Sequence, residues 1–498
     1  MSNQGYRIIH ESSDVDDENV NVDDENDAIQ DENDDVDDEN NDVFDDNKTI
    51  SFVCHDSILN LTVQESSLCI LAHALRFNLS DRALESQLKL VDLHLPYAEH
   101  RSKYRFLKNI SLPQFIEYYF CYECAIILTF ERNECLCPSC GKKYSKRILK
   151  REGEYFLYNP LESQIKEFCN SKLYKHFRKI DPDDRCVLNG KIYKKLERLG
   201  IIEQNDVTLS WNVDGVSLMK SSKKSTWSIL LTINEIPYKF SKDYVILCGL
   251  WHNKKIPKMN MFLKPFAEEC KHLYQNGMEC TTYGRVNSIK FKVHLIVSPI
   301  DTIARPIVQN MKQFNGTYGC PYCYQKSVSL NDNPLNRVYL KNENLLRRTI
   351  QMHKKHVAEA IKTPFAVYGV KGPSIMSIIP NLNILLHFPP EYMHSWLLGI
   401  TKMIVKSWFD PQFKNEPFYI GATLKIVNER LLNIKPPSEL TRCPCEINDM
   451  TKASEWKNFA LYYSLPVMKG FKRMKTEDRK EKKLENVKQA GLDIKIGF

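Results

Sequence analysis

The chain has 498 residues, of which 43% are hydrophobic, and a formal net charge of +7. Residues 1–18 lack the basic start and apolar core of a secretory signal, and no run of about 18 apolar residues could span a membrane. These properties argue against a secreted or membrane-spanning protein and predict a globular chain of roughly two to four domains.

The net charge is unevenly divided along the chain. Residues 1–47 contain 19 Asp and Glu and one Arg, a local net charge of −18. The remainder holds 68 Lys and Arg against 43 Asp and Glu, a net charge of +25. A globular body this basic suits a polyanionic partner such as nucleic acid, and a lysine-rich surface that serves only solubility is the alternative.

Both ends of the chain are strongly charged and lack hydrophobic periodicity. The phrase VDDEN occurs at 15–19, 22–26 and 36–40, which predicts a disordered acidic tail over residues 1–49. This tail either masks the basic body until DNA displaces it or is solvated without a specific role. Residues 469–498 form a second charged tail, where the chain looks truncated or shifted in frame.

The segment 50–118 has helical periodicity. A helix capped by Ser80 would place Leu84, Leu88 and Val91 on one face. With the preceding apolar stretch it predicts two helices, either a DNA-reading helix-turn-helix or a plain helical hairpin. Residues 151–206 are basic and predict a helical linker.

From residue 207 the pattern changes to strands. It predicts three consecutive strands, over residues 208–218, 225–236 and 243–251. A helix over 261–277, closed by Gly277, a fourth strand over 286–300 and a second helix over 302–314 follow. A meander followed by a parallel crossover strand is the order of an RNase H-like α/β core. We place the first part of this core at 207–319, a partly helical insertion at 320–450 and a closing helix at 451–468.

Two CxxC pairs separated by twelve residues predict a zinc ribbon over residues 119–150. The cysteines are Cys121, Cys124, Cys137 and Cys140. Each pair can offer two sulfurs to one ion in a tetrahedral cage, and a closed four-cysteine site is structural rather than catalytic. Cys135 is a bystander in this interpretation.

A second group of candidate zinc ligands combines Cys320 and Cys323 with Glu391 and His394. Together they offer two sulfurs, one oxygen and one nitrogen, which would brace the insertion. Two buried thiols and a hydrogen-bonded histidine are the alternative.

Three acidic residues are candidates for catalysis. Asp214 lies on the first predicted strand, Asp301 ends the fourth, and Glu455 opens the closing helix, where Trp456, Phe459 and Tyr463 would fix it to the core. Carboxylates suit Mg²⁺ or Mn²⁺, and two such ions stabilise the attacking and leaving oxygens of phosphoryl displacement. If the three acids meet, the chain cuts or joins phosphodiester bonds.

Basic residues near these acids are candidates for contacts with DNA phosphates. Lys220, Lys223 and Lys224 follow the first acid, and Arg305 lies one helical turn after the second. A surface salt bridge is the alternative for Arg305.

The chain resembles the animal-type transposases of CACTA (En/Spm-like) DNA elements. The matching phrases are WNVDGVSLMKSSKKSTWSILLTINEIP, GLWHNKKIPKMNMFLKPFAEE, DTIARPIVQNMKQFNGTYGCPYC, EYMHSWLLGITK and KASEWKNFALYYSLP, within roughly residues 50–468. The resemblance implies an RNase H-like DDE core whose acids fall on Asp214, Asp301 and Glu455. Its CxxC falls on Cys320 and Cys323, and its DxxH falls on Glu391 and His394, with Glu in place of Asp.

The resemblance implies metal-dependent cleavage at element ends and strand transfer into target DNA. We therefore expect double-stranded DNA as partner, a nuclear location and the possibility of a homo-oligomer. A catalytically inactive DNA-binding or interaction protein is the alternative, because the C-terminal sequence departs from the family. A thiol-redox role finds no support, since the first CxxC is paired with a second.

Overall fold

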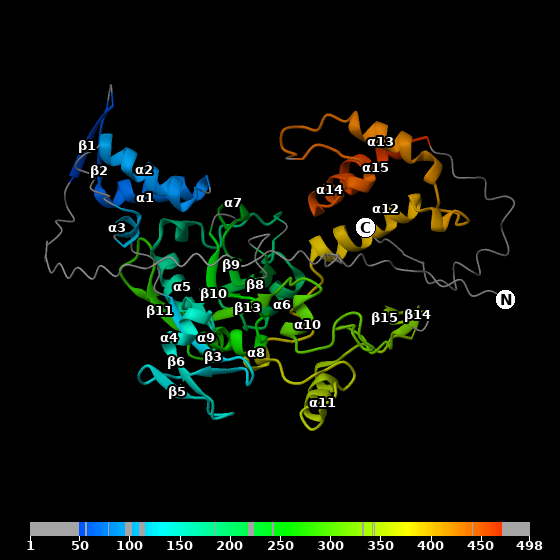
Figure 1. Ribbon diagram of the computed structural model, residues 1–498, viewed down its shortest axis with the longest axis horizontal. Coiled ribbons are helices and arrows are strands. Elements are labelled where there is room, and N and C mark those ends of the chain that lie inside the picture. Colours follow the sequence, from blue (N-terminus) through cyan, green and yellow to red (C-terminus); the bar gives the residue numbers. More distant parts are fainter. Residues whose placement is uncertain are drawn as a thin grey trace, which may run out of the picture. The chain divides into compact units, whose positions relative to one another are not determined.

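The computed structural model describes residues 49–470 except for 55–56, 78, 95–101, 109–114, 185, 218–223, 242–243, 331–332, 341, 343 and 441. The chain divides into two compact units, with the boundary between Gln114 and Phe115 (Figure 1). Almost all of both predicted tails, together with Lys220 and Lys223, lies outside the described residues.

The smaller unit begins with a β-hairpin that the sequence analysis did not predict. Strands β1 (Thr49–Cys54) and β2 (Ser57–Thr62) pair antiparallel. Three helices follow, α1 (Val63–Arg76), α2 (Asp81–His94) and α3 (Lys103–Lys108). They share a small core of Ile70, Ala74, Leu84, Leu88 and Phe106.

The start and buried face of α2 confirm the prediction made from its periodicity. The Ser80 hydroxyl accepts a hydrogen bond from the Ala83 N–H at 3.2 Å, as an N-cap does. Leu84 and Leu88 are buried, and Val91 packs against the same core. The choice between a helical hairpin and a DNA-reading motif stays a prediction.

The larger unit is built on a mixed seven-stranded sheet with the order β13-β8-β9-β10-β7-β3-β4. Its long strands are β8 (Val207–Val216), β9 (Ser225–Ile233) and β10 (Ile246–Asn253), which form an antiparallel meander. Strand β13 (Val293–Val297) lies beside β8 and runs parallel to it. This is the strand order that the hydrophobic alternation predicted.

The sheet extends further than predicted. β3 (Ile116–Cys121), β4 (Ile126–Leu128) and β7 (Tyr155–Tyr158) join it beyond β10. The segment 119–150 is therefore part of the sheet domain rather than a module apart. The segment 151–206 likewise contributes a sheet strand and is not purely a helical linker.

Helices pack on the sheet through buried aromatic and aliphatic side chains. α9 (Lys264–Gln275) has Pro265 in its first turn and ends just before Gly277, whose φ is 69°. Phe266 of α9 packs against Trp211 of β8, with ring centroids 5.4 Å apart. The other helices near the sheet are α5 (Leu161–Asn170), α6 (Lys191–Arg198), α7 (Tyr238–Ser241) and α8 (Met259–Phe262).

The predicted fourth strand is split into two. β12 (Ser288–Phe291) pairs with β11 (Met278–Thr281) in a separate hairpin, and only β13 enters the large sheet. The following helix, α10 (Ala304–Val308), is also shorter than predicted. Asn310 adopts a left-handed φ of 52° directly after it, a conformation that does not continue a helix.

The insertion begins with irregular structure and then becomes helical. It contains the hairpin of β14 (Val328–Leu330) and β15 (Asn333–Val338), then α11 (Ile350–Ala360). The π-helix η3 (Tyr392–Thr401) continues directly into α12 (Lys402–Phe409), so the insertion is partly helical, as predicted.

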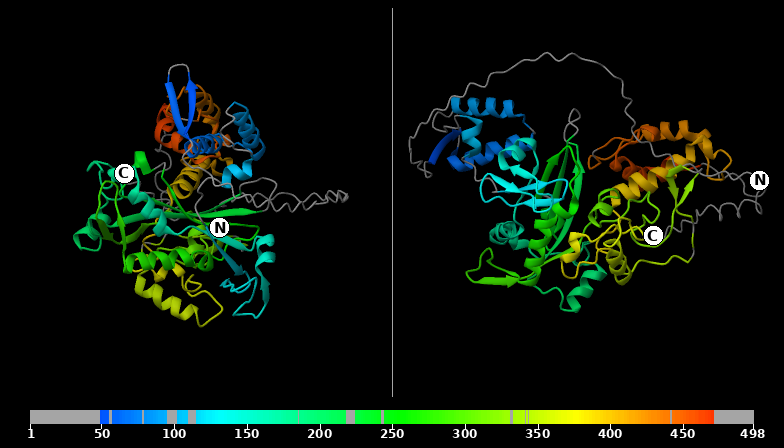
Figure 2. Two further views of the ribbon diagram at one scale, coloured as in Figure 1. Left: turned by 90° about the vertical axis from the view of Figure 1, so that its left-hand side faces the viewer. Right: turned by 60° about the horizontal axis from the view of Figure 1, so that its bottom comes forward.

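The C-terminal helices form a group with its own core (Figures 1 and 2). η3 and α12 pack there with α13 (Leu424–Leu432), α14 (Ala453–Asn458), η7 (Phe459–Tyr463) and α15 (Ser464–Met468). Trp456, Phe459 and Tyr463 are buried as predicted, but in this core rather than in that of the sheet. No helix among the described residues combines the length and apolar character needed to cross a membrane.

Candidate functional site

Asp214 is positioned by the last part of strand β8. It pairs with Ser228 of β9, and its Oδ1 accepts a hydrogen bond from the Gly215 N–H at 2.7 Å. Gly215 is required by close packing, because a Cβ there would lie 2.4 Å from the Trp227 ring. The phrase WNVDG therefore places a half-buried carboxylate beside a tightly packed tryptophan.

Asp301 lies just beyond the end of the neighbouring parallel strand. The last paired residues of β13 and β8 are Val297 and Ser210, and each acid lies four residues further along its own chain segment. The Asp301 carboxylate accepts hydrogen bonds from the N–H groups of Ile303 and Ala304 at the start of α10. Because parallel strands end at the same edge of a sheet, the two aspartates share that edge.

Burial and nearby charges both act on the Asp214 carboxylate. Burial raises the pKa of Asp214 above its usual value, and the negative charges of Asp301 and Glu391 add to that rise. The Gly215 N–H and the His394 side chain act in the opposite direction. The carboxylate oxygens of Asp214 and Asp301 are hard donors, the kind of ligand that Mg²⁺ and Mn²⁺ prefer.

Glu391 and His394 stand at the start of η3, where Glu391 is the N-cap. The Glu391 carboxylate accepts from the backbone N–H groups of Met393 and His394 and lies 2.9 Å from His394 Nδ1. Thr302 and Ser395 hydroxyls lie 3.4 Å apart, which joins this turn to the segment that follows Asp301. The structure thus brings the start of η3 next to the segment that carries Asp301.

Glu455 has a different local role. Its carboxylate accepts hydrogen bonds from the Thr451 and Lys452 N–H groups, both at 2.8 Å, and lies 3.4 Å from Arg442 Nη1. These contacts cap the start of α14. The predicted third acid is thus held as a helix cap.

Cys320 and Cys323 are not gathered with Glu391 and His394. The buried Arg348 donates to both cysteine carbonyls, at 2.9 and 3.1 Å, and holds the CxxC turn by its backbone. Within the described part of the chain, a single group of at least three potential metal ligands comes together. It consists of Cys121, Cys124, Cys137 and Cys140. His394 is hydrogen-bonded, as in the alternative, but the thiols of Cys320 and Cys323 are only partly buried.

The four predicted cysteines do come together. The sulfurs of Cys121, Cys124, Cys137 and Cys140 lie within 4.8 Å of one another, and those of Cys121 and Cys140 are 4.0 Å apart. Tetrahedral zinc with bonds of about 2.3 Å would separate sulfurs by about 3.8 Å, so the four fit this ion.

The two CxxC turns share a backbone feature. The residue after each second cysteine has a left-handed conformation, with φ 54° at Ala125 and 70° at Gly141. Backbone N–H groups of Cys140 and Ser139 lower the pKa of Cys137 to about 7. The Tyr144 hydroxyl donates a hydrogen bond to Cys121 Sγ at 3.1 Å and so orients this sulfur.

The basic residues that were predicted to contact DNA phosphates differ in their surroundings. Lys224 is exposed at the start of β9, whereas Lys220 and Lys223 lie outside the described residues. Arg305 is 6% exposed, and its guanidinium bonds the Tyr322 hydroxyl at 3.2 Å. Arg305 is thus neither placed to contact DNA nor part of a surface salt bridge, and its role is internal packing.

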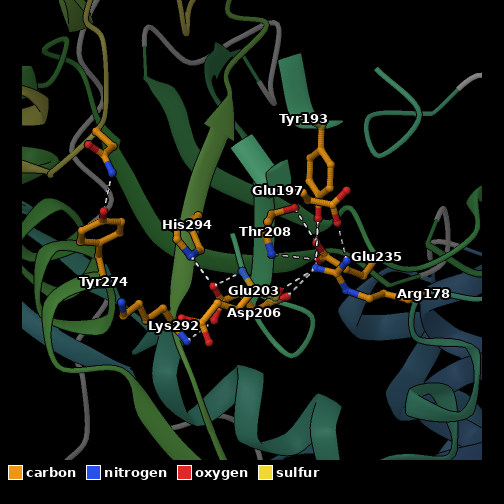
Figure 3. Close-up of polar contacts among 11 residues, drawn as sticks. Arg178, Tyr193, Glu197, Glu203, Asp206, Thr208, Glu235, Tyr274, Lys292 and His294 are labelled. Atoms are coloured by element: carbon orange, nitrogen blue, oxygen red, sulfur yellow. Dashed lines mark hydrogen bonds and ion pairs between the residues drawn. The ribbon is translucent and has the colours of Figure 1, made fainter. Parts of the chain in front are cut away.

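Sequence reasoning missed a buried polar network at the opposite end of β8 (Figure 3). Asp206 accepts from the Lys292 N–H at 2.8 Å and lies 2.9 Å from His294 Nε2. It thereby ties the start of β8 to the start of β13. This contact helps to set the parallel register that brings Asp214 and Asp301 to one edge.

Glu235 completes the network from the end of β9. It is fully buried and accepts from the Thr208 N–H at 2.9 Å and from the Thr208 and Tyr193 hydroxyls, with Arg178 nearby (Figure 3). Burial raises its pKa to about 7, which its hydrogen-bonding neighbours and Arg178 only partly oppose. No local pattern signals these residues, because strand pairing alone brings them together.

Glu235 should make stability fall with rising pH. Its pKa is near 4.5 when unfolded and about 7 when folded, so between these values the folded chain keeps a proton that the unfolded chain has lost. The free energy of unfolding should therefore decrease by about 3 kcal/mol across this window. Glu235→Gln mimics the neutral acid and should remove this slope. Urea unfolding at pH 5 and 7.5 checks it, and parallel pH profiles for both proteins would contradict it.

Two aspartates at adjoining ends of parallel strands, in a mixed α/β fold, define a candidate metal-binding active site. Residues 190–364 match the family model described as transposase family tnp2. This region includes both aspartates and the sheet strands that carry them. The match supports a transposase family for the chain, and such a family implies DNA binding. No curated protein was found to match the chain.

Proposed function

We propose that the chain is a transposon-derived DDE transposase that cleaves double-stranded DNA and joins it to a new site. The observation that carries the proposal is the pair Asp214 and Asp301, which share one sheet edge inside the region similar to transposases. The meander β8-β9-β10 with a parallel β13 supports an RNase H-like core. We place the chain with the CACTA type and propose a nuclear location.

The chemistry follows from the oxygen-rich character of this edge. Asp214 and Asp301 would hold Mg²⁺ or Mn²⁺, which supplies charge stabilisation to the attacking and leaving oxygens of an in-line phosphoryl displacement. The backbone N–H groups at Gly215, Ile303 and Ala304 orient the two carboxylates. A water molecule and then a 3′-hydroxyl would be the nucleophiles, at element ends and at target DNA respectively.

Two further parts of the proposal concern the rest of the chain. The four cysteines at 121, 124, 137 and 140 would hold a structural Zn²⁺ that stabilises the far side of the sheet. Transposon ends and target DNA would be the partners, with assembly into a homo-oligomer as a further possibility.

A catalytically inactive DNA-binding protein is the second candidate. The observation that favours it is the place of Glu455, whose carboxylate caps α14 instead of joining the aspartates. A site with two aspartates and no third acid would bind metal more weakly. Such a protein would keep its salt-sensitive affinity for DNA without cutting it.

The deciding experiment measures nicking and strand transfer by the full chain on DNA that carries the flanking repeats of its element. Activity that needs Mg²⁺ or Mn²⁺ and stops with a chelator is expected. DNA binding that weakens steeply with salt, without cleavage in either metal, would establish the inactive DNA-binding protein instead.

The third carboxylate can be assigned by comparing two matched substitutions. Because the charge of Glu391 acts on Asp214, we expect Glu391→Gln to lower the cleavage rate by at least about 10-fold, a typical cost of losing a group that supports a metal site. Glu455→Gln should then lower it less, since Gln retains an acceptor for the Thr451 and Lys452 N–H groups. The opposite ranking would restore Glu455 as the third acid and require α14 to move when DNA binds.

A further inference from the structure

An exposed row of aromatic and apolar side chains runs along η3 and into α12. Tyr392, Trp396, Ile400 and Met403 are 49%, 37%, 45% and 47% exposed. The rings of Tyr392 and Trp396 lie together, with centroids 4.9 Å apart. Tyr462 of η7, 52% exposed, is close enough to act electrostatically on Tyr392.

This row is not the packing face of the helix. η3 and α12 bury Leu397, Thr401 and Val405, and two of these enter the core that contains Trp456. The row lies on another side of the same helix. Neighbouring aromatic side chains that stay exposed on a surface mark an interaction site more often than scattered apolar residues do.

The row begins beside the candidate active site. Two residues here are Glu391, whose charge acts on Asp214, and Ser395, whose hydroxyl lies 3.4 Å from that of Thr302. Tyr392 and Trp396 each follow one of them by a single residue, so they occupy the adjoining face of the helix. A DNA strand whose phosphate lies at the two aspartates would pass along this face.

We propose that Tyr392 and Trp396 stack on unpaired bases of the DNA strand next to the phosphate that is cleaved. This inference rests on the proposed function and names the form of DNA that the same site binds. Aromatic faces accept any base, because every base presents a π-surface, and such stacking holds single-stranded segments in a groove that is also basic. Lys402 and Lys406 add positive charge to the next turns.

Binding should therefore favour DNA with unpaired nucleotides at the cleavage position. The probes are a fully paired duplex and the same duplex with two unpaired nucleotides there, one of them 2-aminopurine. The full chain is used without divalent metal, so that binding is measured apart from cleavage. We expect tighter binding of the second DNA, with quenching of the 2-aminopurine fluorescence as the base stacks on a ring.

Substitutions at Trp396 distinguish stacking on unpaired bases from a general contribution to DNA binding. Trp396→Ala should weaken binding of the unpaired DNA by about 10-fold and abolish the quenching, with little effect on the duplex. Trp396→Phe should retain most of both. Leu465→Ala is the control, because Leu465 is an 84% exposed apolar residue outside the row. Thermal unfolding should show that all variants fold equally well.

Three results of the binding and light-scattering measurements would overturn the inference. One is that the wild type and Trp396→Ala each bind the two DNAs with equal affinity. Another is that Trp396→Ala weakens binding of the duplex and of the unpaired DNA by the same factor. The third is a shift of Trp396→Ala to a smaller oligomer in light scattering, which would assign the row to contact with a second copy. Absence of DNA binding altogether would instead refute the proposed function, whereas Mg²⁺-dependent cleavage without a Trp396 effect would refute this inference alone.

Discussion

Asp214→Asn and Asp301→Asn are each expected to abolish metal-dependent DNA cleavage while the chain stays folded. Asn keeps an Oδ1 atom that can accept from the Gly215 N–H, or from the Ile303 and Ala304 N–H groups, so the local backbone is retained. Only the negative charge that would hold a divalent cation is lost. We expect at least about 10²–10³-fold slower cleavage, the cost of removing one preorganised electrostatic group.

The control for these substitutions is Asp410→Asn. Asp410 is also a capping carboxylate, which accepts from the Gln412 N–H at 2.9 Å in front of η4 (Pro411–Phe413). Its replacement should leave the cleavage rate within about twofold. The double variant of Asp214 and Asp301 should be no slower than either single variant, since two ligands of one site act as a unit. More than a tenth of the wild-type rate in Asp301→Asn would refute the proposed role of this acid.

The placement of the aspartate pair could be predicted because it depends on strand order alone. Alternating burial in β8, β9 and β10 is visible in the sequence, and a parallel strand beside the first brings their carboxyl ends to one edge. The length of the strand that precedes Asp301 was less predictable. Its first half pairs with β11 in a hairpin, and no local pattern distinguishes the two halves.

The extent of the sheet could not be predicted for a related reason. β7 has only four residues within a basic segment that has helical periodicity, and it is a strand because β10 and β3 pair with it. Tertiary pairing overrides local propensity in such short segments. The network around Asp206 depends in the same way on the register of β8 and β13.

The third acid shows that the function of a carboxylate cannot be assigned from its family position alone. Glu455 stands at the third position of α14, where a carboxylate commonly caps the first turn. Glu391 stands before η3 and caps it in a similar way, yet its charge also reaches Asp214. The sequence around either residue contains a capping signal, and only the packing of the helices distinguishes them.

Removing zinc is expected to unfold the region of β3 to β6. In this region β5 (Glu134–Leu136) pairs with β6 (Lys143–Ser145), and α4 (Lys146–Glu152) follows. The core around the four cysteines is small, and its buried residues are Tyr119, Cys121, Leu128, Cys137 and Leu149. So small a core depends on additional cross-links. Structural zinc contributes about 10–16 kcal/mol in isolated zinc fingers, and we expect a loss of more than about 4 kcal/mol here, because pairing with β7 retains part of β3.

Cys137→Ser tests this expectation against the matched change Cys135→Ser. Cys135 lies two residues away on β5 but outside the group of four. Elemental analysis should find one zinc per chain in the wild type and in Cys135→Ser, and less in Cys137→Ser, with a clearly lower melting temperature. β3 and β4 lie on the far side of β10 from β8 and β13, so a zinc ion held by the cysteines would stabilise the sheet without touching the aspartates. If Cys137→Ser kept both its zinc and its melting temperature, the four sulfurs would be no more than a cluster of free thiols.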